Sequence, residues 1–483
     1  MSSVREDTIK SIKWSAIEKF STQIMQFVLG IIMARLLLPS DYGTVGMLAI
    51  FIAVSQTFVD SGFSQALIRK LDRTETDFST VFYFNFAVAC LLYALLFLCA
   101  PSIASFYNTP ILCELLRVQA FTLIIGALMG IHNAKLTIAL DFKALARRSV
   151  LATFISGIVG VICAYIGMGV WSLVIQTILA QLINMIFVWV YLRWIPSSVI
   201  SKRSFTELFS FGGKLLVSGL VHTIYTNMTT LIIGKFFSAK DLGYYTRGTQ
   251  FATLPVNTMN EVLGKVLYPI MVKLQNDDDH LVVVYRKYIV TMSIVIFFCC
   301  ILLVSVAKPL ILLLLTDKWA EAIIYLQIFS FAIMFDHICS INLTLLKVKG
   351  RSDLFLRLEI IKKIIATIIL FSSIPFGVMG ICISKLINIQ IAVFVNTYYT
   401  GKLFNLGYKE QMKDFLGYLV MSVISCLPGY FIATYTTMPN IVSLIVCSII
   451  GCGLYVFCLR KDKYAREIYS LVSEKFSFLP KLK

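Results

Sequence analysis

Charged residues are scarce in this sequence. Only 14% of its 483 residues are Asp, Glu, Lys or Arg, whereas 58% are apolar. Soluble domains contain about 25% charged residues, so this composition excludes a soluble protein of this length. The polar stretches between the apolar runs are also too short to fold as a separate soluble domain.

Motifs for metal, redox and nucleotide chemistry are missing as well. The twelve cysteines are scattered through apolar runs without a C-x-x-C pair, and the four histidines form no ligand cluster. Isolated cysteines in apolar runs are typical of small packing residues. No G-x-x-x-x-G-K-[ST] phosphate loop occurs, which argues against ATP hydrolysis. We expect no metal, no cofactor and no catalytic group, so the protein is not expected to be an enzyme.

What the sequence does contain is a series of long apolar runs. A helix needs about 20 apolar residues to cross a bilayer, and fourteen such runs occupy nearly the whole chain. The N-terminus has no small-residue cleavage site, so no signal peptide is expected. We predict an all-α integral membrane protein with helices at 14–38, 41–64, 78–101, 112–134, 148–167, 170–194, 211–237, 242–269, 284–308, 321–346, 357–376, 378–401, 413–435 and 438–460.

Lys and Arg alternate between the connections. Gly167–Gly169 and Met438–Asn440 contain none, whereas other connections are basic, among them the groups Arg69, Lys70, Arg73 and Lys135, Lys143, Arg147, Arg148. Basic residues are retained on the cytoplasmic side, so we predict cytoplasmic N- and C-termini. A net charge of +17 would also suit a nucleic-acid binder. Contact with anionic lipid explains it better, and no nucleic-acid partner is expected.

A repeat is visible at an offset of 200 residues. It pairs Ile32, Asp41, Gly43 and Phe51 with Ile232, Asp241, Gly243 and Phe251. Six crossings separate the two copies, and an even number preserves orientation. We therefore predict two parallel six-helix lobes around a central cavity, as in some transporters. The boundaries are 1–200 for the N-lobe, 201–405 for the C-lobe, and 406–483 for two additional helices and a basic tail.

Polar residues at membrane depth are candidate functional groups, because burying them in lipid is costly. Arg247, Gln250, Asn257 and Glu261 are spaced by three, seven and four residues, so they share one face of the expected helix 242–269. This face lines a water-filled cavity or contacts another helix, and both alternatives stay open. Pro255 interrupts the same segment and favours a bend.

Two further candidates are Asp60 and Lys385. Asp60 lies near the cytoplasmic end of the second apolar run. Two roles are open for it: it pairs with a basic residue as a gate, or it caps the next turn. Lys385 lies on the twelfth run, and Asp336 and His337 lie on the tenth. A structural hydrogen bond between helices is an equal alternative for these groups. The five tryptophans fall near segment ends, which predicts interfacial anchors.

Several stretches resemble the Wzx-type, polysaccharide-export branch of the multidrug/oligosaccharidyl-lipid/polysaccharide exporter superfamily. The similarity extends over essentially the whole chain, and it is with the flippases of the colanic-acid and teichuronic-acid kind. The stretches that carry it are Pro39-Ser-Asp-Tyr-Gly43, Phe58-Val-Asp-Ser-Gly-Phe-Ser-Gln-Ala-Leu-Ile68, Gly169-Val-Trp-Ser-Leu-Val-Ile-Gln176, Leu242-Gly-Tyr-Tyr-Thr-Arg247, Leu254-Pro255, Lys318-Trp319 and Gly350-Arg351.

The resemblance implies a function. It implies a flippase in the bacterial inner membrane that moves an undecaprenyl-diphosphate-linked oligosaccharide outward by alternating access, for lipopolysaccharide or exopolysaccharide synthesis. The implied partners are that lipid-linked oligosaccharide and membrane lipids, with a proton or sodium ion as a candidate coupling ion. It also implies a cavity role for Arg247, whose counterpart in the first repeat is Met47. The alternatives are a drug/cation antiporter of the same superfamily and a membrane glycosyl polymerase or ligase.

Overall fold

The computed structural model describes residues 2–467, with backbone only for residues 2–13, 15, 16 and 261–266. The described residues contain helices and no strands, and they form two compact units, Met1–Gly243 and Tyr244–Lys483. This confirms the predicted all-α fold. The lobe boundaries at residues 200 and 405 were drawn from the repeat and stay predictions.

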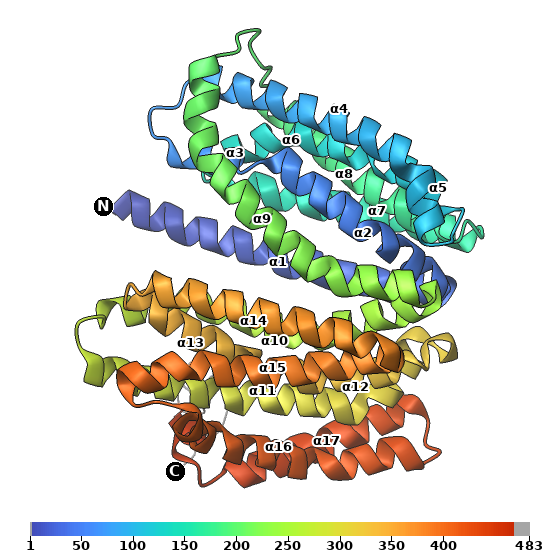
Figure 1. The fold of residues 1–483 in the computed structure, drawn as a ribbon. Coiled ribbons are helices and arrows are strands. Elements are labelled where there is room, and N and C mark those ends of the chain that lie inside the picture. The colour runs from blue at the N-terminus through green and yellow to red at the C-terminus, as the bar shows by residue number, and fades with distance from the viewer. Residues whose placement is uncertain (1, 468–483) are drawn as a thin grey trace. The chain divides into compact units, whose positions relative to one another are not determined.

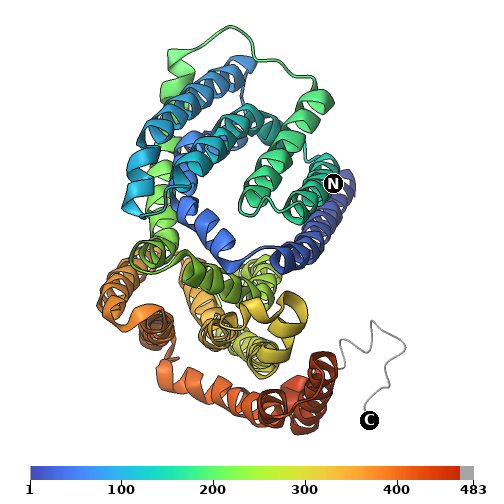
Figure 2. The ribbon, with the colours of Figure 1, turned by 90° about the vertical axis from the view of Figure 1, so that its right-hand side faces the viewer.

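The first unit is a bundle of long helices that run in roughly the same direction (Figure 1). After the 90° turn of Figure 2 these helices are seen obliquely. They are α1 (Ser2–Leu36), α2 (Pro39–Asp60), α3 (Phe63–Arg69), α4 (Glu75–Phe106), α5 (Leu112–Gln119), α6 (Phe121–Ile138), α7 (Phe142–Tyr165), α8 (Trp171–Leu192) and α9 (Lys202–Phe236).

The second unit continues with α10, which starts in the first unit, and ends with α16 and α17 packed against α11 (Figure 1). Its elements are α10 (Ala239–Lys273), α11 (Asp278–Leu315), the short 3₁₀ helix η1 (Asp317–Trp319), α12 (Ala322–Ile333), α13 (Asp336–Val348), α14 (Ser352–Ser373), the 3₁₀ helix η2 (Ile374–Phe376), α15 (Gly377–Phe404), α16 (Tyr408–Tyr435) and α17 (Asn440–Leu459).

Each of the fourteen expected segments coincides with one of these helices or with two in succession. Among the described residues, eleven stretches are long and apolar enough to cross a membrane, and one of them, Ser352–Phe404, contains two expected segments. The remaining two expected segments are α1 and α10. The protein is therefore a multi-pass membrane protein.

Three of the expected helices are each divided into two in the structure. For the first of them, the backbone conformation explains the break. The expected helix 41–64 ends at Asp60 because Ser61 and Gly62 adopt left-handed conformations, with φ of 43° and 69°. The expected helix 112–134 is divided at Ala120 into α5 and α6, and the tenth is divided between Ile333 and Asp336. By contrast, α10 continues as one helix through Pro255.

Helix α9 packs along α2 within the first unit through small residues. A Cβ on Gly219 would lie 3.2 Å from the Thr57 methyl group, and one on Gly212 would lie 3.0 Å from the Ser61 carbonyl oxygen. The hydroxyls of Thr57 and Thr223 are 3.0 Å apart in the same seam. Small residues allow two helices to approach closely in a membrane, where packing replaces the hydrophobic effect as the main attraction.

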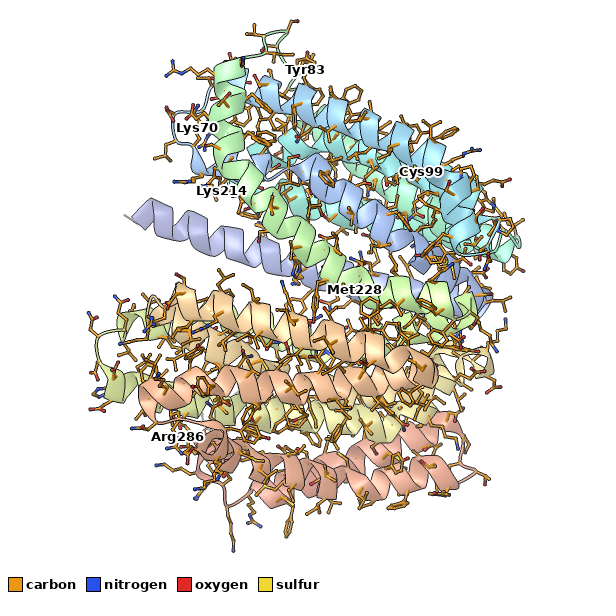
Figure 3. All side chains as sticks on the ribbon, in the orientation of Figure 1. Lys70, Tyr83, Cys99, Lys214, Met228 and Arg286 are labelled. Atoms are coloured by element: carbon orange, nitrogen blue, oxygen red, sulfur yellow. The ribbon has the colours of Figure 1, made fainter. Side chains whose placement is uncertain are left out.

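Lys70 joins three elements at one end of the first unit. Its Nζ lies 3.2 Å from the Asp77 carboxylate on α4 and 3.1 Å from the Glu207 carboxylate on α9. Burial would lower the pKa of Lys70, but hydrogen bonds to the two carboxylates hold it above its ordinary value. Cys99 lies at the opposite end of this unit (Figure 3), so α4 traverses the unit from end to end.

Helix α16 is tied into the second unit by a buried polar network. Tyr285 of α11 and Thr400 of α15 each donate a hydrogen bond of 2.8 Å to Oδ1 of Asn342 on α13. The Asn342 amide donates to Oε1 of Gln411 on α16 at 2.9 Å. All four side chains are fully buried. Satisfied networks of this kind specify one packing arrangement.

The expectation that every tryptophan is an interfacial anchor is wrong for Trp319. Its side chain is fully buried, and its ring packs edge-on against Tyr244 with centroids 6.1 Å apart. A position near a segment end predicts interfacial exposure only where no neighbouring helix covers the residue. Here Tyr244, in the second turn of α10, packs against it.

Candidate functional site

The first turn of α10 repeats the first turn of α2. At the start of α2 the Asp41 carboxylate accepts the backbone N–H of Leu38 at 2.9 Å, and at the start of α10 the Asp241 carboxylate accepts the backbone N–H of Ser238 at 3.2 Å. Both aspartates thus satisfy a donor that a helix start otherwise leaves unpaired. The Asp-x-Gly repeat therefore corresponds to the same local structure in both places.

The two turns also pack against each other reciprocally. A Cβ on Gly43 would lie 1.6 Å from the carbonyl oxygen of Ala239, and a Cβ on Gly243 would lie 1.9 Å from that of Pro39. The contacts are related by the 200-residue offset, because residue 39 matches 239 and residue 43 matches 243. Glycine is required at both positions, since any side chain would overlap backbone atoms.

Contacts on both sides of Arg247 fix its place on α10. Tyr244 donates its hydroxyl to the Lys318 carbonyl at 3.1 Å, and the Tyr245 ring packs edge-on against Phe329 at 5.1 Å. Gly248 approaches α12 so closely that a Cβ would lie 2.7 Å from the Tyr325 Cβ. These contacts anchor this part of α10 against η1 and α12 on both sides of Arg247.

Arg247 itself is buried, with 8% of its surface exposed. Its Nη1 donates a hydrogen bond of 2.6 Å to Oε1 of Gln250, one turn further along α10. The structure thus brings together two of the predicted site residues. Gln250 is exposed. The hydrogen-bonded pair therefore consists of a buried guanidinium and an exposed amide.

The other two residues of the predicted α10 face are Asn257 and Glu261. Asn257 is exposed on α10, while the side chain of Glu261 lies outside the described residues. Asn260 donates its amide to the Asp336 carboxylate on α13 at 3.1 Å. The middle of α10 therefore makes a polar contact with α13 through Asn260, which is not one of the four residues of the predicted face.

Asp336 is the centre of a second group of charges in the second unit. It lies where the α12–α13 segment is interrupted, and the positive charges of Lys385 on α15 and Lys362 on α14 act on its carboxylate. Lys362 also forms an ion pair of 2.5 Å with Glu359. Lys385 and Asp336 are thus close enough for their charges to interact. No feature of the sequence singles out Glu359 and Lys362, because both lie in the first half of an expected helix that starts at the cytoplasmic side.

Asp60 takes neither of its two expected roles among the described residues. Its Oδ1 accepts a hydrogen bond of 3.3 Å from Gln56, one turn earlier on α2. The next helix, α3, starts at Gly62 without a side-chain cap, so the capping interpretation is wrong. No described basic residue forms an ion pair with Asp60. The left-handed Ser61 and Gly62 make the turn that Asp60 was expected to cap.

His337 is a structural residue. It is fully buried, and its ring nitrogens lie 3.0 Å from the Ser293 hydroxyl and 2.7 Å from the Met334 carbonyl oxygen. Neither neighbour is charged, which is typical of a neutral imidazole. Within the described part of the chain, no group of three or more His, Cys, Asp or Glu side chains is arranged to hold a metal ion.

Comparison with known proteins gives the family. The model of a family described as "Polysaccharide biosynthesis protein" matches residues 32–324, which include both repeated turns, Arg247 and η1. The chain belongs to this family.

Proteins of two bacteria are similar to this chain over most of their length. The teichuronic acid biosynthesis protein TuaB of Bacillus subtilis (strain 168) is 26% identical over 95% of this chain and 97% of its own. The lipopolysaccharide biosynthesis protein WzxC of Escherichia coli (strain K12) is 22% identical over 81% of each chain.

The fold is also that of a solved transporter. The structure titled "Lipid II flippase MurJ, inward closed conformation" matches with a TM-score of 0.74, covering 95% of this chain and 99% of that chain at 15% sequence identity. At this identity the match establishes the shared fold, while the family membership rests on the sequence match.

Proposed function

We propose that this protein moves a polyprenyl-diphosphate-linked oligosaccharide across the membrane for the synthesis of a surface polysaccharide. The family match over residues 32–324 carries the proposal. The full-length similarity to TuaB supports it, because that protein is named for biosynthesis of a polysaccharide. The names of these relatives do not specify which glycan this chain carries.

The chemistry of such a substrate matches the candidate site. The sugars need a polar surface, the diphosphate needs cations, and the prenyl chain remains in lipid. A guanidinium binds phosphate through a planar fork of donors, and Arg247 offers one that is 8% exposed and oriented by Gln250. In such partly dehydrated surroundings a charge-assisted hydrogen bond is stronger than in water.

No bond needs to be made or broken in this reaction, so the protein acts as a transporter rather than an enzyme. The membrane potential favours outward movement, because one charge crossing 100 mV is worth about 2.3 kcal/mol. A diphosphate with about two negative charges therefore gains roughly 4–5 kcal/mol at that voltage. The carrier works by alternating access, so the empty protein must return to its inward-facing state. A proton or sodium ion would be coupled to this return step.

We place the protein in the bacterial inner membrane with both termini in the cytoplasm. This orientation follows from the positive-inside rule, and it starts α2 and α10 at the outer face. The substrate then enters from the inner leaflet, where lipid-linked sugars carry their diphosphate at the surface.

A drug/cation antiporter is the main alternative. Such a carrier would place carboxylates at the site for its cationic substrate, whereas Arg247 suits an anion. A glycosyl polymerase or ligase is a weaker alternative, because the connections Gly167–Gly169 and Met438–Asn440 leave no room for a catalytic outer loop.

A leaflet-accessibility assay tests the proposal. Purified protein is reconstituted into vesicles that contain a fluorescent polyprenyl-diphosphate oligosaccharide, and an enzyme added outside then digests the exposed sugar. We expect the protected half of the label to become accessible in protein-containing vesicles and to remain protected in empty ones. Equal protection in both would contradict the proposal, and uptake of a cationic dye instead would favour the antiporter.

A further inference from the structure

Arg148 of the first unit has an unusual set of neighbours for a residue of a basic loop. It lies two turns into α7, because Asp141 caps that helix by accepting the Ala144 backbone N–H at 3.0 Å and so starts it six residues before the expected segment. Arg148 is six residues beyond Phe142, the first residue of α7, which corresponds to about 9 Å along the helix axis. The residue is thus inside the helix bundle and half-buried.

The guanidinium is only partly satisfied by the protein. Its Nη1 donates to the Asn133 side-chain oxygen on α6, while its Nε is buried with no hydrogen-bond partner among the described residues. A guanidinium has five N–H donors in a fixed plane. A buried donor without a partner is costly, so this arrangement is one that an added acceptor would stabilise.

Glu18 supplies an opposing charge that acts on Arg148 without an ion pair between the two among the described residues. It lies on α1, and its charge acts on the Arg148 guanidinium. Its Oε1, however, accepts a hydrogen bond of 2.7 Å from Ser149, and no ion pair joins the two among the described residues. The carboxylate therefore balances the charge of Arg148 and leaves guanidinium donors available.

We propose that Arg148 is a binding residue for the substrate diphosphate at the cytoplasmic side of the first unit. This inference rests on the proposed function. By the predicted orientation, α7 starts at the cytoplasmic face, so Arg148 is within reach of a diphosphate that comes from the inner leaflet. Arg247 lies two turns from the outer end of α10. Met47, its counterpart in the first repeat, carries no charge, and Arg148 supplies a cation to the first unit at the other face.

In this proposal Glu18 helps to release the substrate during the transport cycle. A diphosphate that binds Arg148 competes with the Glu18 charge, so the carboxylate weakens binding and helps to release the substrate. Asn133 is a positioning residue, because it orients the guanidinium through Nη1. A purely structural Arg148 would instead join α7 to α6 and would show no dependence of anion binding on Glu18.

The test measures binding of farnesyl diphosphate to the purified full-length protein by native mass spectrometry. Farnesol is the uncharged probe, and Arg147→Gln is the matched control, since Arg147 is an exposed neighbour on the same helix. We expect Arg148→Gln to weaken diphosphate binding on the order of tenfold, with farnesol unaffected. Arg147→Gln should bind as the wild type does. Glu18→Gln should bind more tightly than the wild type.

Two results would overturn the site. One is unchanged binding by a folded Arg148→Gln variant, and the other is an equal loss in Arg147→Gln, which would indicate a general effect of basic charge. If Arg148→Gln does not fold, Glu18→Gln decides: tighter binding supports the site and unchanged binding opposes it. If the wild type binds the diphosphate through Arg148 but moves no oligosaccharide in vesicles, the proposed function fails and the site stands.

Discussion

Gly43 packs directly against the main chain at Ala239, where an added Cβ would lie 1.6 Å from the carbonyl oxygen. The contact joins the starts of two helices that the sequence repeat makes equivalent, and Gly243 makes the matching contact with Pro39. The two Asp-capped turns thus close on one another at the face where α2 and α10 begin.

Gly43→Ala is expected to lower the melting temperature of the purified protein by several degrees. Overpacking typically costs about 1–3 kcal/mol, and backbone atoms on the opposite side cannot rotate away. Gly243→Ala should have a similar effect because the contact is reciprocal. Gly417→Ala is the matched control, since a Cβ there meets nothing within 4 Å. An unchanged melting temperature in Gly43→Ala would show that the turns are apart in solution.

Arg247→Ala is expected to reduce surface polysaccharide about tenfold or more while the protein still inserts. Hydrogen bonds to charged groups contribute about 1.5–3 kcal/mol, and each 1.4 kcal/mol changes affinity tenfold. Arg247→Lys should retain part of the activity, because the charge remains without the planar fork. The measurement is cell-surface polysaccharide normalised to membrane-inserted protein. Arg351→Ala is the control, since Arg351 pairs with Asp353 at an exposed position. Full export by a well-expressed Arg247→Ala variant would refute the role of Arg247.

The topology predicts opposite labelling at two connections. A cysteine introduced as Met168→Cys should react with an impermeant maleimide added to intact cells, because Gly167–Gly169 faces outside. Asn276→Cys should react only after the membrane is opened, because the connection between α10 and α11 faces the cytoplasm. The wild type provides the background from its twelve cysteines. Labelling of position 168 from the cytoplasmic side alone would invert the topology.

Asn342→Leu is expected to destabilise the protein without a specific loss of transport. The substitution leaves the Tyr285 and Thr400 hydroxyls without their shared acceptor, and a buried polar group without a partner costs about 1–3 kcal/mol. Thermal unfolding is the measurement. Thr344→Ala on the same helix is the control, since its hydroxyl donates to the Ser340 carbonyl one turn earlier on that helix. Transport per folded molecule should stay near the wild-type value in both variants.

Lys385 and Asp336 are expected to be coupled. Lys385→Met removes a cation that acts on the Asp336 carboxylate, and Asp336→Asn removes the opposing charge from Lys385. Each single variant should lower protein yield or melting temperature, and the double variant should recover part of the loss, as neighbouring sites are not additive. Lys402→Met, at the exposed end of the same helix, should have little effect. Additive single effects would mean that the two residues act separately.

The sequence predicts which polar residues lie on the same face of one helix. It does not predict which residues of different helices come into contact. Arg247 and Gln250 were expected on one face because they are three positions apart, and they do form a hydrogen bond. The association of Lys385 with Asp336 was not predictable, because the two lie on different helices. Asp60 was expected near the end of a helix that continues to residue 64, but the left-handed turn at Ser61 and Gly62 ends the helix at Asp60 itself.

By itself the sequence determined the membrane class, the places of the fourteen segments and the equivalence of the two Asp-x-Gly turns. These properties are local, since they depend on apolar length and on the chemistry of a helix start. The tertiary structure decided which polar side chains meet. Glu18 and Ser149 are 131 positions apart in the chain, and only the packing of α1 on α7 brings them to Arg148. Side-chain partners across helices depend on how the helices rotate and cross, and no short-range pattern in the sequence records that geometry.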